Sequence, residues 1–349
     1  MAKISFQGVG ISALSACVPP HTVYNKDLGY LIPDEDIEKT INNIGIVERR
    51  IAAPEVTASD LCYKAAMRLM ADNDIEPDSI DVLLFMSQTA DYRIPATSCL
   101  LQQRLGLSKD TLCLDISLGC SGYIYALSTA FAYASLPGVR RVLLLDGETF
   151  SKIVNRRDKV DWPLYGDAGT ATLIEKGDFG QSTFMLFTDG SNADALKIHA
   201  GMRNPITPES CVEREREDGN IRSDLEVFMD GMDVFNFAIS KVPKSVKLLL
   251  SETGKTAEDL DYIIFHQANR FMMDFFVKKL KISPQRVPYC IHKYGNTSSS
   301  SVPLTIASEL SDKLDGDKTL VLSAFGAGMS WGSVMINTHD CKVSPVFDY

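Results

Sequence analysis

The sequence has no long apolar run, no surplus of positive charge and no paired cysteine motif. Its hydrophobic runs are shorter than the roughly 20 residues of a membrane-spanning helix, and its first residues lack the pattern of a signal peptide. The formal net charge of −10 argues against nucleic acid as the main partner. We therefore expect a cytoplasmic protein that binds neither nucleic acid nor membranes.

The eight cysteines form no CxxC pair, and most of them lie inside apolar runs. That pattern indicates reduced thiols rather than a disulfide framework or a zinc site. The sequence also has no low-complexity linker, so its composition does not mark a boundary between domains. What remains is an ordinary globular composition, with 45% hydrophobic and 23% charged residues over 349 positions. This length is sufficient for a large core and for two domains or one duplicated domain.

Cys120 lies in the turn Ser117–Gly122, between an apolar run at Leu112–Ile116 and a segment rich in Ala, Leu, Tyr and Phe at Tyr123–Ser135. The run predicts a buried strand, and the segment predicts a helix buried nearly all round. Backbone N–H groups and the positive end of the helix dipole favour a thiolate at this turn and can hold an oxyanion. Alternatively, Cys120 is one more small buried apolar residue.

The second half of the sequence repeats the plan of the first. RLMADNDIEPDSIDVLLF at 68–85 matches LLLSETGKTAEDLDYIIF at 248–265 in its order of helix end, turn, acidic cluster and strand. Two further pairs keep nearly the same offset: RVLLLDG at 141–147 with TLVLSAF at 319–325, and the Cys120 segment with GNTSSSSVPLTIASEL at 295–310.

Because register is kept as well as order, we infer one βα unit present twice. It predicts an amino-terminal half at 1–178 and a carboxyl-terminal half at 179–349, each with a mostly parallel sheet and helices on its faces. The charged, proline-containing stretch 200–226 interrupts the pattern and is interpreted as a loop or flap, with a solvated connection as the simpler explanation.

Three polar motifs in the second half each have a structural and a chemical explanation. His266, in HQAN, follows a predicted strand and is either a satisfied structural residue or a catalytic one. Asn296, in GNTSSSSVP, either caps a helix or offers a carboxamide to a site. The turn FGAGMSWG, which contains Ala327, indicates close backbone approach.

The duplication favours the chemical explanation for all three. In a duplicated fold, the strand ends and helix N-termini of both halves meet at the pseudo-twofold axis, so Cys120, His266, Asn296 and the turn 326–328 can converge. A thiol, an imidazole, a carboxamide and backbone donors together form an acyl-transfer site.

With the motifs SLGCSGYIYAL, HQAN, GNTSSSSVP and FGAGMSWG in place, the sequence resembles the thiolase-fold condensing enzymes, and within them the β-ketoacyl-acyl-carrier-protein synthase III family. The likeness covers essentially the whole chain, including GIVERRIA, DYRIPATS and YGDAGTATLIE. It implies a thiolase-like duplicated fold of five layers, α/β/α/β/α.

The resemblance also implies a catalytic triad of Cys120, His266 and Asn296, with the backbone N–H groups of Cys120 and Ala327 as the oxyanion hole. The implied reaction is a decarboxylative Claisen condensation of an acyl thioester with malonyl-acyl carrier protein, through an acyl-Cys120 intermediate, in the initiation of fatty acid synthesis or a related pathway. No metal or redox cofactor is required. The alternative is a specialised acyltransferase or condensing enzyme of a secondary or surface-polysaccharide pathway that uses an acyl-carrier donor. The intact triad argues against a non-catalytic acyl-binding subunit.

Two partners follow from the resemblance. The carrier protein is acidic in this family, and the basic residues after HQAN are either its dock or a solvated face: Arg270, Lys278, Lys279 and Lys281. We expect them on a helix that turns Phe271, Phe275 and Leu280 inward. Family members are homodimers in which a loop of one subunit, near Ile94 in this sequence, closes the acyl pocket of the other.

One departure concerns the acyl donor. Typical members carry a Trp and an Arg that sandwich the adenine of coenzyme A, and the matching positions here are Lys39 and Asn43. Met232 stands where an Asn is usual. The donor is therefore either acyl-coenzyme A, held by substitute contacts from a neighbouring loop, or an acyl-carrier protein.

Overall fold

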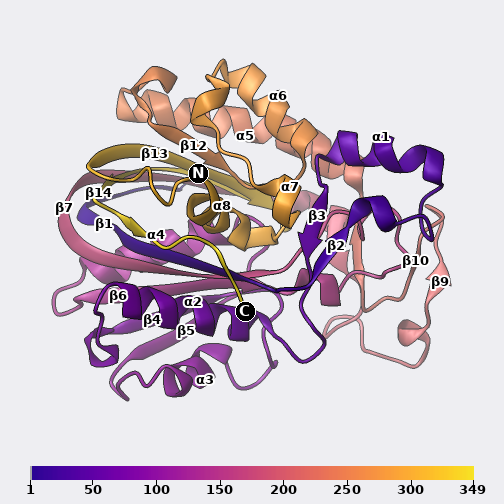
Figure 1. Ribbon diagram of the computed structural model, residues 1–349, viewed down its shortest axis with the longest axis horizontal. Coiled ribbons are helices and arrows are strands. Elements are labelled where there is room, and N and C mark those ends of the chain that lie inside the picture. Colours follow the sequence, from indigo (N-terminus) through magenta and orange to yellow (C-terminus); the bar gives the residue numbers. More distant parts are fainter. Residues whose placement is uncertain (1) are drawn as a thin grey trace.

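The computed structural model describes residues 2–349 and has five alternating layers of helices and sheet (Figure 1). The α-helices are α1 (Asp34–Ile44), α2 (Ala58–Asp72), α3 (Thr97–Arg104), α4 (Gly122–Ser135), α5 (Gly231–Thr253), α6 (Arg270–Leu280), α7 (Ile291–Tyr294) and α8 (Ser301–Glu309). The longer strands are β1 (Ala2–Val18), β4 (Val82–Met86), β5 (Leu112–Ile116), β6 (Arg141–Glu148), β7 (Ala168–Thr188), β12 (Tyr262–Phe265), β13 (Asp317–Gly326) and β14 (Ser330–His339). The shorter strands are β2 (Thr22–Tyr24), β3 (Glu48–Arg50), β8 (Leu196–Ile198), β9 (Arg214–Glu215), β10 (Ile221–Arg222), β11 (Val227–Met229), β15 (Lys342–Val343) and β16 (Phe347–Asp348).

The strand pairing repeats between the two halves, as the duplicated sequence predicts. In the first half, β4 pairs parallel with β6, β6 antiparallel with β7, and β7 antiparallel with β1. In the second half, β12 pairs parallel with β13, β13 antiparallel with β14, and β14 antiparallel with β7. The expectation of mostly parallel sheets is wrong, because long consecutive strands such as β13 and β14 are joined by a tight turn, which only antiparallel pairing allows.

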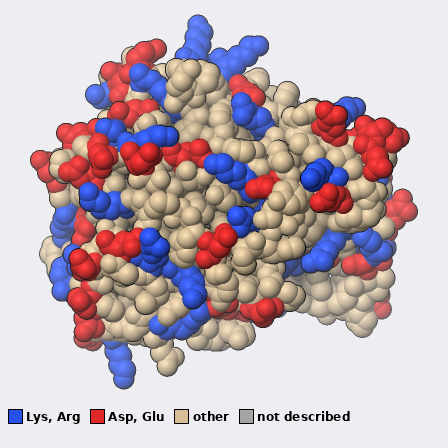
Figure 2. All heavy atoms as spheres, viewed as in Figure 1, with Lys and Arg blue, Asp and Glu red and all other residues tan. Residues whose placement is uncertain are grey.

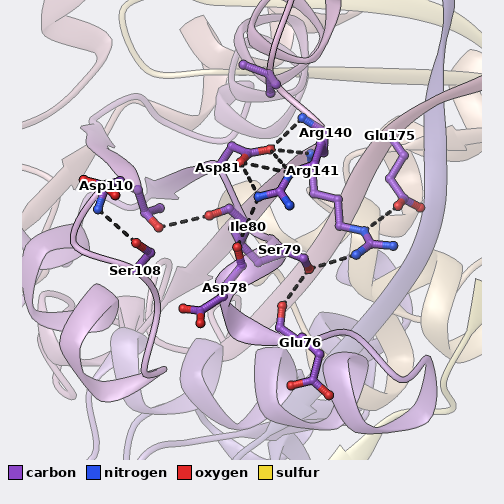
Figure 3. Close-up of polar contacts among 12 residues, drawn as sticks. Glu76, Asp78, Ser79, Ile80, Asp81, Ser108, Asp110, Arg140, Arg141 and Glu175 are labelled. Atoms are coloured by element: carbon purple, nitrogen blue, oxygen red, sulfur yellow. Dashed lines mark hydrogen bonds and ion pairs between the residues drawn. The ribbon is translucent and has the colours of Figure 1, made fainter.

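The repeat extends to single hydrogen bonds at the start of the strands. Asp81 donates its N–H to the carbonyl of Arg141 at 3.1 Å, and Asp81 Oδ2 accepts the N–H of Arg141 at 3.3 Å (Figure 3). Asp261 and Thr319 make the same pair of bonds in the second half, at 2.9 and 2.8 Å. In the first half, ion pairs from Arg140 to Asp81 and from Arg141 to Glu175 strengthen this end of the sheet.

The central layer holds the two helices that carry the site. Helices α4 and α8 lie between the sheet regions and pack on inward residues such as Val82 and Leu84 of β4. The alternate residues Leu83 and Phe85 face the other way and pack under α2. Helices α5 and α6 cover the outer face of the second half, at the top of Figure 1. This arrangement directs the N-termini of α4 and α8 toward one buried region.

The strand at Leu112–Ile116 is present, but the expectation that it is buried is wrong. Strand β5 has β4 as its single neighbour and therefore forms an edge of the sheet. Leu112 and Leu114 are 42% and 39% exposed. Helix α4 agrees with expectation, because most of its residues are fully buried.

The stretch 200–226 is more ordered than a solvated connection. It contains the two-stranded pair β9–β10 and a buried arginine, Arg222, that pairs with Asp158 at 2.9 Å and also with Asp218. Within residues 2–349, no helix combines the length and the apolar composition needed to cross a membrane.

Candidate active site

Cys120 lies two residues before α4, on the turn that follows β5. Its side chain is 6% exposed. The glycines around it are required by space: a Cβ on Gly326 would lie 2.8 Å from the Cys120 backbone nitrogen, and one on Gly119 would lie 3.1 Å from the Ala327 nitrogen. The glycine-rich turn after β13 therefore packs directly on the cysteine turn.

Two hydroxyl contacts fasten these turns together. Ser121 Oγ lies 2.6 Å from Ser330 Oγ, and Ser330 Oγ donates to the Ala327 carbonyl at 2.9 Å. In residues 2–349, neither the Cys120 nor the Ala327 backbone N–H donates to a backbone carbonyl. Over the described residues, both N–H groups are thus without a backbone acceptor where the two turns pack together.

Ser298 links the three side chains that the sequence singled out. Its Oγ donates to Cys120 Sγ at 3.5 Å, and its N–H donates to Asn296 Oδ1 at 2.9 Å. Its backbone also forms a hydrogen bond with His266. Ser298 belongs to the motif GNTSSSSVP, but its left-handed backbone, with φ of 54°, is not signalled by a serine.

His266 follows β12 and is 1% exposed. Its Nδ1 lies 2.7 Å from Ser301 Oγ, at the start of α8, which leaves Nε2 for other partners. Its ring packs edge-on against Phe325, with ring centroids 5.4 Å apart. Burial lowers the pKa of His266 to about 3, and the Ser298 backbone acts in the opposite direction. The imidazole is therefore neutral at ordinary pH.

Asn296 is held by the backbone on both of its sides. Its N–H donates to Leu164 O at 2.8 Å, and its carbonyl accepts the N–H of Gly166 at 3.1 Å. The fully buried Arg49 supports the same segment through a bond from Nη1 to Tyr165 O at 3.0 Å. Arg49, which belongs to the motif GIVERRIA, is therefore a structural support of the Asn296 position.

Electrostatics around Cys120 differ from the expectation of a favoured thiolate. Burial raises the pKa of the thiol to about 11, and the carboxyl groups of Glu148 and Asp146 add to the rise. The hydrogen bond from Ser298 acts in the opposite direction. Burial also raises the pKa of Glu148 to about 7. The protonated thiol is therefore the resting form, because burial is the largest influence on its pKa.

The remaining predicted residues lie near the surface. Arg270 is half-exposed, pairs with Asp274 at 2.8 Å and lies over the ring of Tyr289 at 4.2 Å. Lys278 and Lys279 are exposed in the last turn of α6. Lys281, just beyond that turn, is exposed too, as are Lys39 and Asn43 on α1. Ile94 is 88% exposed.

The expectation that Phe271, Phe275 and Leu280 of α6 point inward is wrong for Phe271. Phe271 is 61% exposed and stacks on Phe235 of α5, with ring centroids 5.6 Å apart, while Met272, Met273 and Phe276 are the buried residues of α6. Phe271 and the 68% exposed Met232 line a small hollow of about 340 Å³ beside Asn269.

A larger cavity of about 1020 Å³ lies under the stretch 199–231 and reaches Met229, whose sulfur is 3.9 Å from the hydroxyl of Tyr165. Acidic residues dominate its wall, Asp161 among them. Burial raises the pKa of Asp161 to about 8, and the neighbouring Asp158 adds to the rise.

All eight cysteines of the chain are free thiols, in agreement with the expectation of reduced cysteines.

Comparison with known proteins agrees with this geometry. Models for 3-oxoacyl-[acyl-carrier-protein] synthase III match residues 114–193, and models for the C-terminal part of that enzyme match 250–338. The β-ketoacyl-[acyl-carrier-protein] synthase III of Rhodopirellula baltica is 33% identical, covering 95% of this chain and 99% of that protein. The synthase III of Clostridium acetobutylicum is 34% identical, covering 94% and 98%.

Among solved structures, a 3-oxoacyl-(acyl-carrier protein) synthase from Burkholderia xenovorans superposes with a TM-score of 0.94 at 36% identity, covering 100% of this chain and 99% of the other. Synthase III proteins of this kind are acyltransferase-type condensing enzymes with the thiolase-like fold described above. The chain belongs to the 3-oxoacyl-[acyl-carrier-protein] synthase III family.

Proposed function

We propose that this protein condenses an acyl thioester with malonyl-acyl carrier protein, with loss of CO₂, through an acyl-Cys120 intermediate. The observation that supports this most directly is the convergence of Cys120, His266 and Asn296 on Ser298. A thiol, a neutral imidazole and a carboxamide are the groups that acyl transfer followed by decarboxylation requires.

In the first half-reaction, the Cys120 sulfur attacks the acyl carbonyl and the thiol of the donor leaves. Since the Cys120 thiol is protonated at rest, its proton passes to the departing thiol as the carbon–sulfur bond of the donor breaks. His266, whose pKa is lowered to about 3, stays neutral in this step. The backbone N–H groups of Cys120 and Ala327 stabilise the tetrahedral oxyanion in this proposal.

In the second half-reaction, the bond between the malonyl carbon and its carboxylate breaks, and CO₂ leaves an enolate. Hydrogen bonds from His266 and Asn296 stabilise the enolate oxygen. Asn296 uses its Oδ1 for Ser298, so its NH₂ group is the donor that remains. The carbanion then attacks the acyl carbon, the bond to sulfur breaks, and the Cys120 thiolate recovers a proton from solvent.

The carrier protein is proposed to dock over α6. Lys and Arg side chains project from the upper edge of the molecule in Figure 2, where Figure 1 places α5 and α6. Lys278 and Lys279 belong to this helix, whose other end begins at Arg270. The apolar hollow lined by Phe271 and Met232 lies at the start of α6, beside Asn269, and suits the path of an acyl-bearing arm.

The reaction is tested in two steps on the intact protein. Incubation with an acyl donor should add one acyl group, mapped by mass spectrometry to Cys120 and absent from Cys120→Ala. Addition of malonyl-acyl carrier protein should then release CO₂ and discharge the adduct. An adduct on the exposed Cys99 or on Cys113 contradicts the assignment. Discharge to another nucleophile without CO₂ favours the alternative, a specialised acyltransferase.

A further inference from the structure

A buried carboxyl group that the proposed reaction does not use lies behind the serine segment. Ser299 donates its hydroxyl to Asp146 Oδ1 at 2.6 Å, and both residues are fully buried. Asp146 belongs to β6 of the first half, and Ser299 lies just before α8 of the second half. The bond therefore ties the two halves together directly behind the site. In residues 2–349, Asp146 Oδ2 has no hydrogen-bond partner.

The bond from Ser299 to Asp146 supports a backbone segment, Ser298–Ser299, whose conformation is unfavourable by itself. Ser298, the preceding residue, lies in the left-handed region, which a residue with a Cβ adopts at an energetic cost. Its backbone is fixed on one side by Asn296, through the bond at 2.9 Å, and on the other side by the bond from Ser299 to Asp146. At 3.5 Å, the contact from Ser298 to Cys120 is long, so a small shift of the segment breaks it.

A charged Asp146 would add to the raised pKa of the Cys120 thiol, whereas a protonated Asp146 can hold Ser299 without that contribution. Burial raises the pKa of Asp146 well above its ordinary value, and Glu148 on the same strand adds to the rise. The titratable groups that face Asp146 from other elements are Cys62 on α2, Tyr123 on α4 and Cys120. All are neutral acids in their resting forms, so a protonated Asp146 is the form that this environment favours.

We propose that Asp146 is a positioning residue: through Ser299 it holds the Ser298 hydroxyl against Cys120 and thereby sets the reactivity of the thiol. The inference rests on the proposed function only in giving Cys120 the role of acyl acceptor. The proposed effect of Asp146 is on the reactivity of the Cys120 thiol. Alkylation of Cys120 measures this reactivity without any condensation step.

The test is the rate of Cys120 alkylation by iodoacetamide as a function of pH, measured on the Cys120 peptide by mass spectrometry. Loss of the Ser298 donor moves the rate curve to higher pH, because that bond lowers the pKa of Cys120. Ser299→Ala and Asp146→Ala should each slow alkylation roughly three- to tenfold below that pKa, the range expected for one hydrogen bond. Their double variant should be no slower than either single variant.

Two further variants separate positioning from other roles. Asp146→Asn keeps an oxygen for Ser299 and should retain the wild-type curve. Ser300→Ala is the matched control, because Ser300 is the next residue, is equally buried and donates only to the Thr297 carbonyl at 2.8 Å. It should also retain the wild-type curve.

Three results would overturn the proposal: a wild-type curve in Ser299→Ala, an equal slowing in Ser300→Ala, or a shift of Asp146→Asn to lower pH, which marks Asp146 as a buried charge. Should Asp146→Ala fail to fold, Ser299→Ala and Asp146→Asn decide the question. Loss of CO₂ release with the expected alkylation pattern refutes the condensation and leaves this inference standing.

Discussion

The backbone N–H of Ser298 donates to the side-chain oxygen of Asn296 at 2.9 Å. This one bond occupies the side-chain oxygen of Asn296 and fixes the orientation of the carboxamide, so the NH₂ group is the donor that the proposed reaction uses. It also makes Asn296 a support of the residue that contacts Cys120, so its two tasks have to be separated by substitution.

The first prediction separates them. Asn296→Asp keeps the oxygen that accepts from Ser298 and removes the NH₂ donor, so acyl-Cys120 should still form to full occupancy. Release of CO₂ from malonyl-acyl carrier protein should fall on the order of a hundredfold, as for a lost oxyanion donor. Final occupancy by mass spectrometry and labelled CO₂ are the two measurements. Equal loss of both would show that Asn296 serves acylation as much as decarboxylation.

The second prediction concerns the donor. Lys39 and Asn43 offer no flat ring, so the contribution of about 1–3 kcal/mol from stacking on adenine is missing. At matched concentrations, we expect faster acylation of Cys120 from acyl-carrier protein than from the same acyl group on coenzyme A. Salt and Arg270→Glu should reduce the preference, whereas Lys64→Glu, on α2 of the other half, should not. Efficient acylation from micromolar acyl-coenzyme A would contradict this expectation.

The third prediction follows from Glu148, whose pKa burial raises from 4.5 to about 7. Because the folded state binds this proton more tightly, the contribution of the group to stability is fully present below about pH 4.5 and is lost as pH rises through 7. Glu148→Gln removes this loss. The variant should gain on the order of 3 kcal/mol in stability relative to wild type between these limits.

Urea unfolding at a series of pH values measures this gain. The exposed Glu76→Gln serves as the control and should run parallel to wild type at every pH. A Glu148→Gln curve that also runs parallel to wild type would mean that Glu148 is ionised in the folded state throughout.

The fourth prediction concerns assembly. Leu112 and Leu114 expose apolar surface on the edge strand β5, which has one open side. We expect a homodimer across this edge, and Leu114→Lys should halve the mass measured by light scattering. Leu136→Lys, at an exposed leucine after α4, is the control and should leave the mass unchanged.

Ile94→Ala should keep the dimer and change the preferred acyl chain length. An unchanged chain-length preference would show that Ile94 is not part of the acyl pocket.

Much of the fold could be predicted from the sequence because the signals were local or repeated. The offset that relates Asp81 to Asp261 reappears as two matching pairs of hydrogen bonds. The glycines at 119 and 326 indicated the close contact between turns that the structure contains. The placement of Cys120, His266 and Asn296 around one segment likewise followed from where strands end and helices begin.

What the sequence did not predict depends on distant neighbours. The outward position of Phe271 is set by Phe235, 36 positions earlier in the numbering. The exposure of Leu114 depends on β5 having a single neighbour, which its own apolar pattern does not encode. The raised pKa of Cys120 reflects burial and two carboxyl groups on β6, which the residues next to Cys120 in the sequence do not reveal. The contacts of Ser298 and Asp146 could not be predicted from the sequence, because neither residue type marks a site.

Strand β7 pairs with β1 along almost its whole length, from Ala2 with Leu186 to Cys17 with Gly169, while β6 and β14 take its other edge in turn. A nascent chain that has reached only residue 150 therefore holds β1 without its partner, although β4, β5 and β6 are already complete. Neither half can complete its sheet until β7 has been synthesised and has left the ribosome. Folding of both halves thus depends on the same step, the pairing of β7. A destabilising substitution in β7 therefore weakens the sheet that positions both Cys120 and His266.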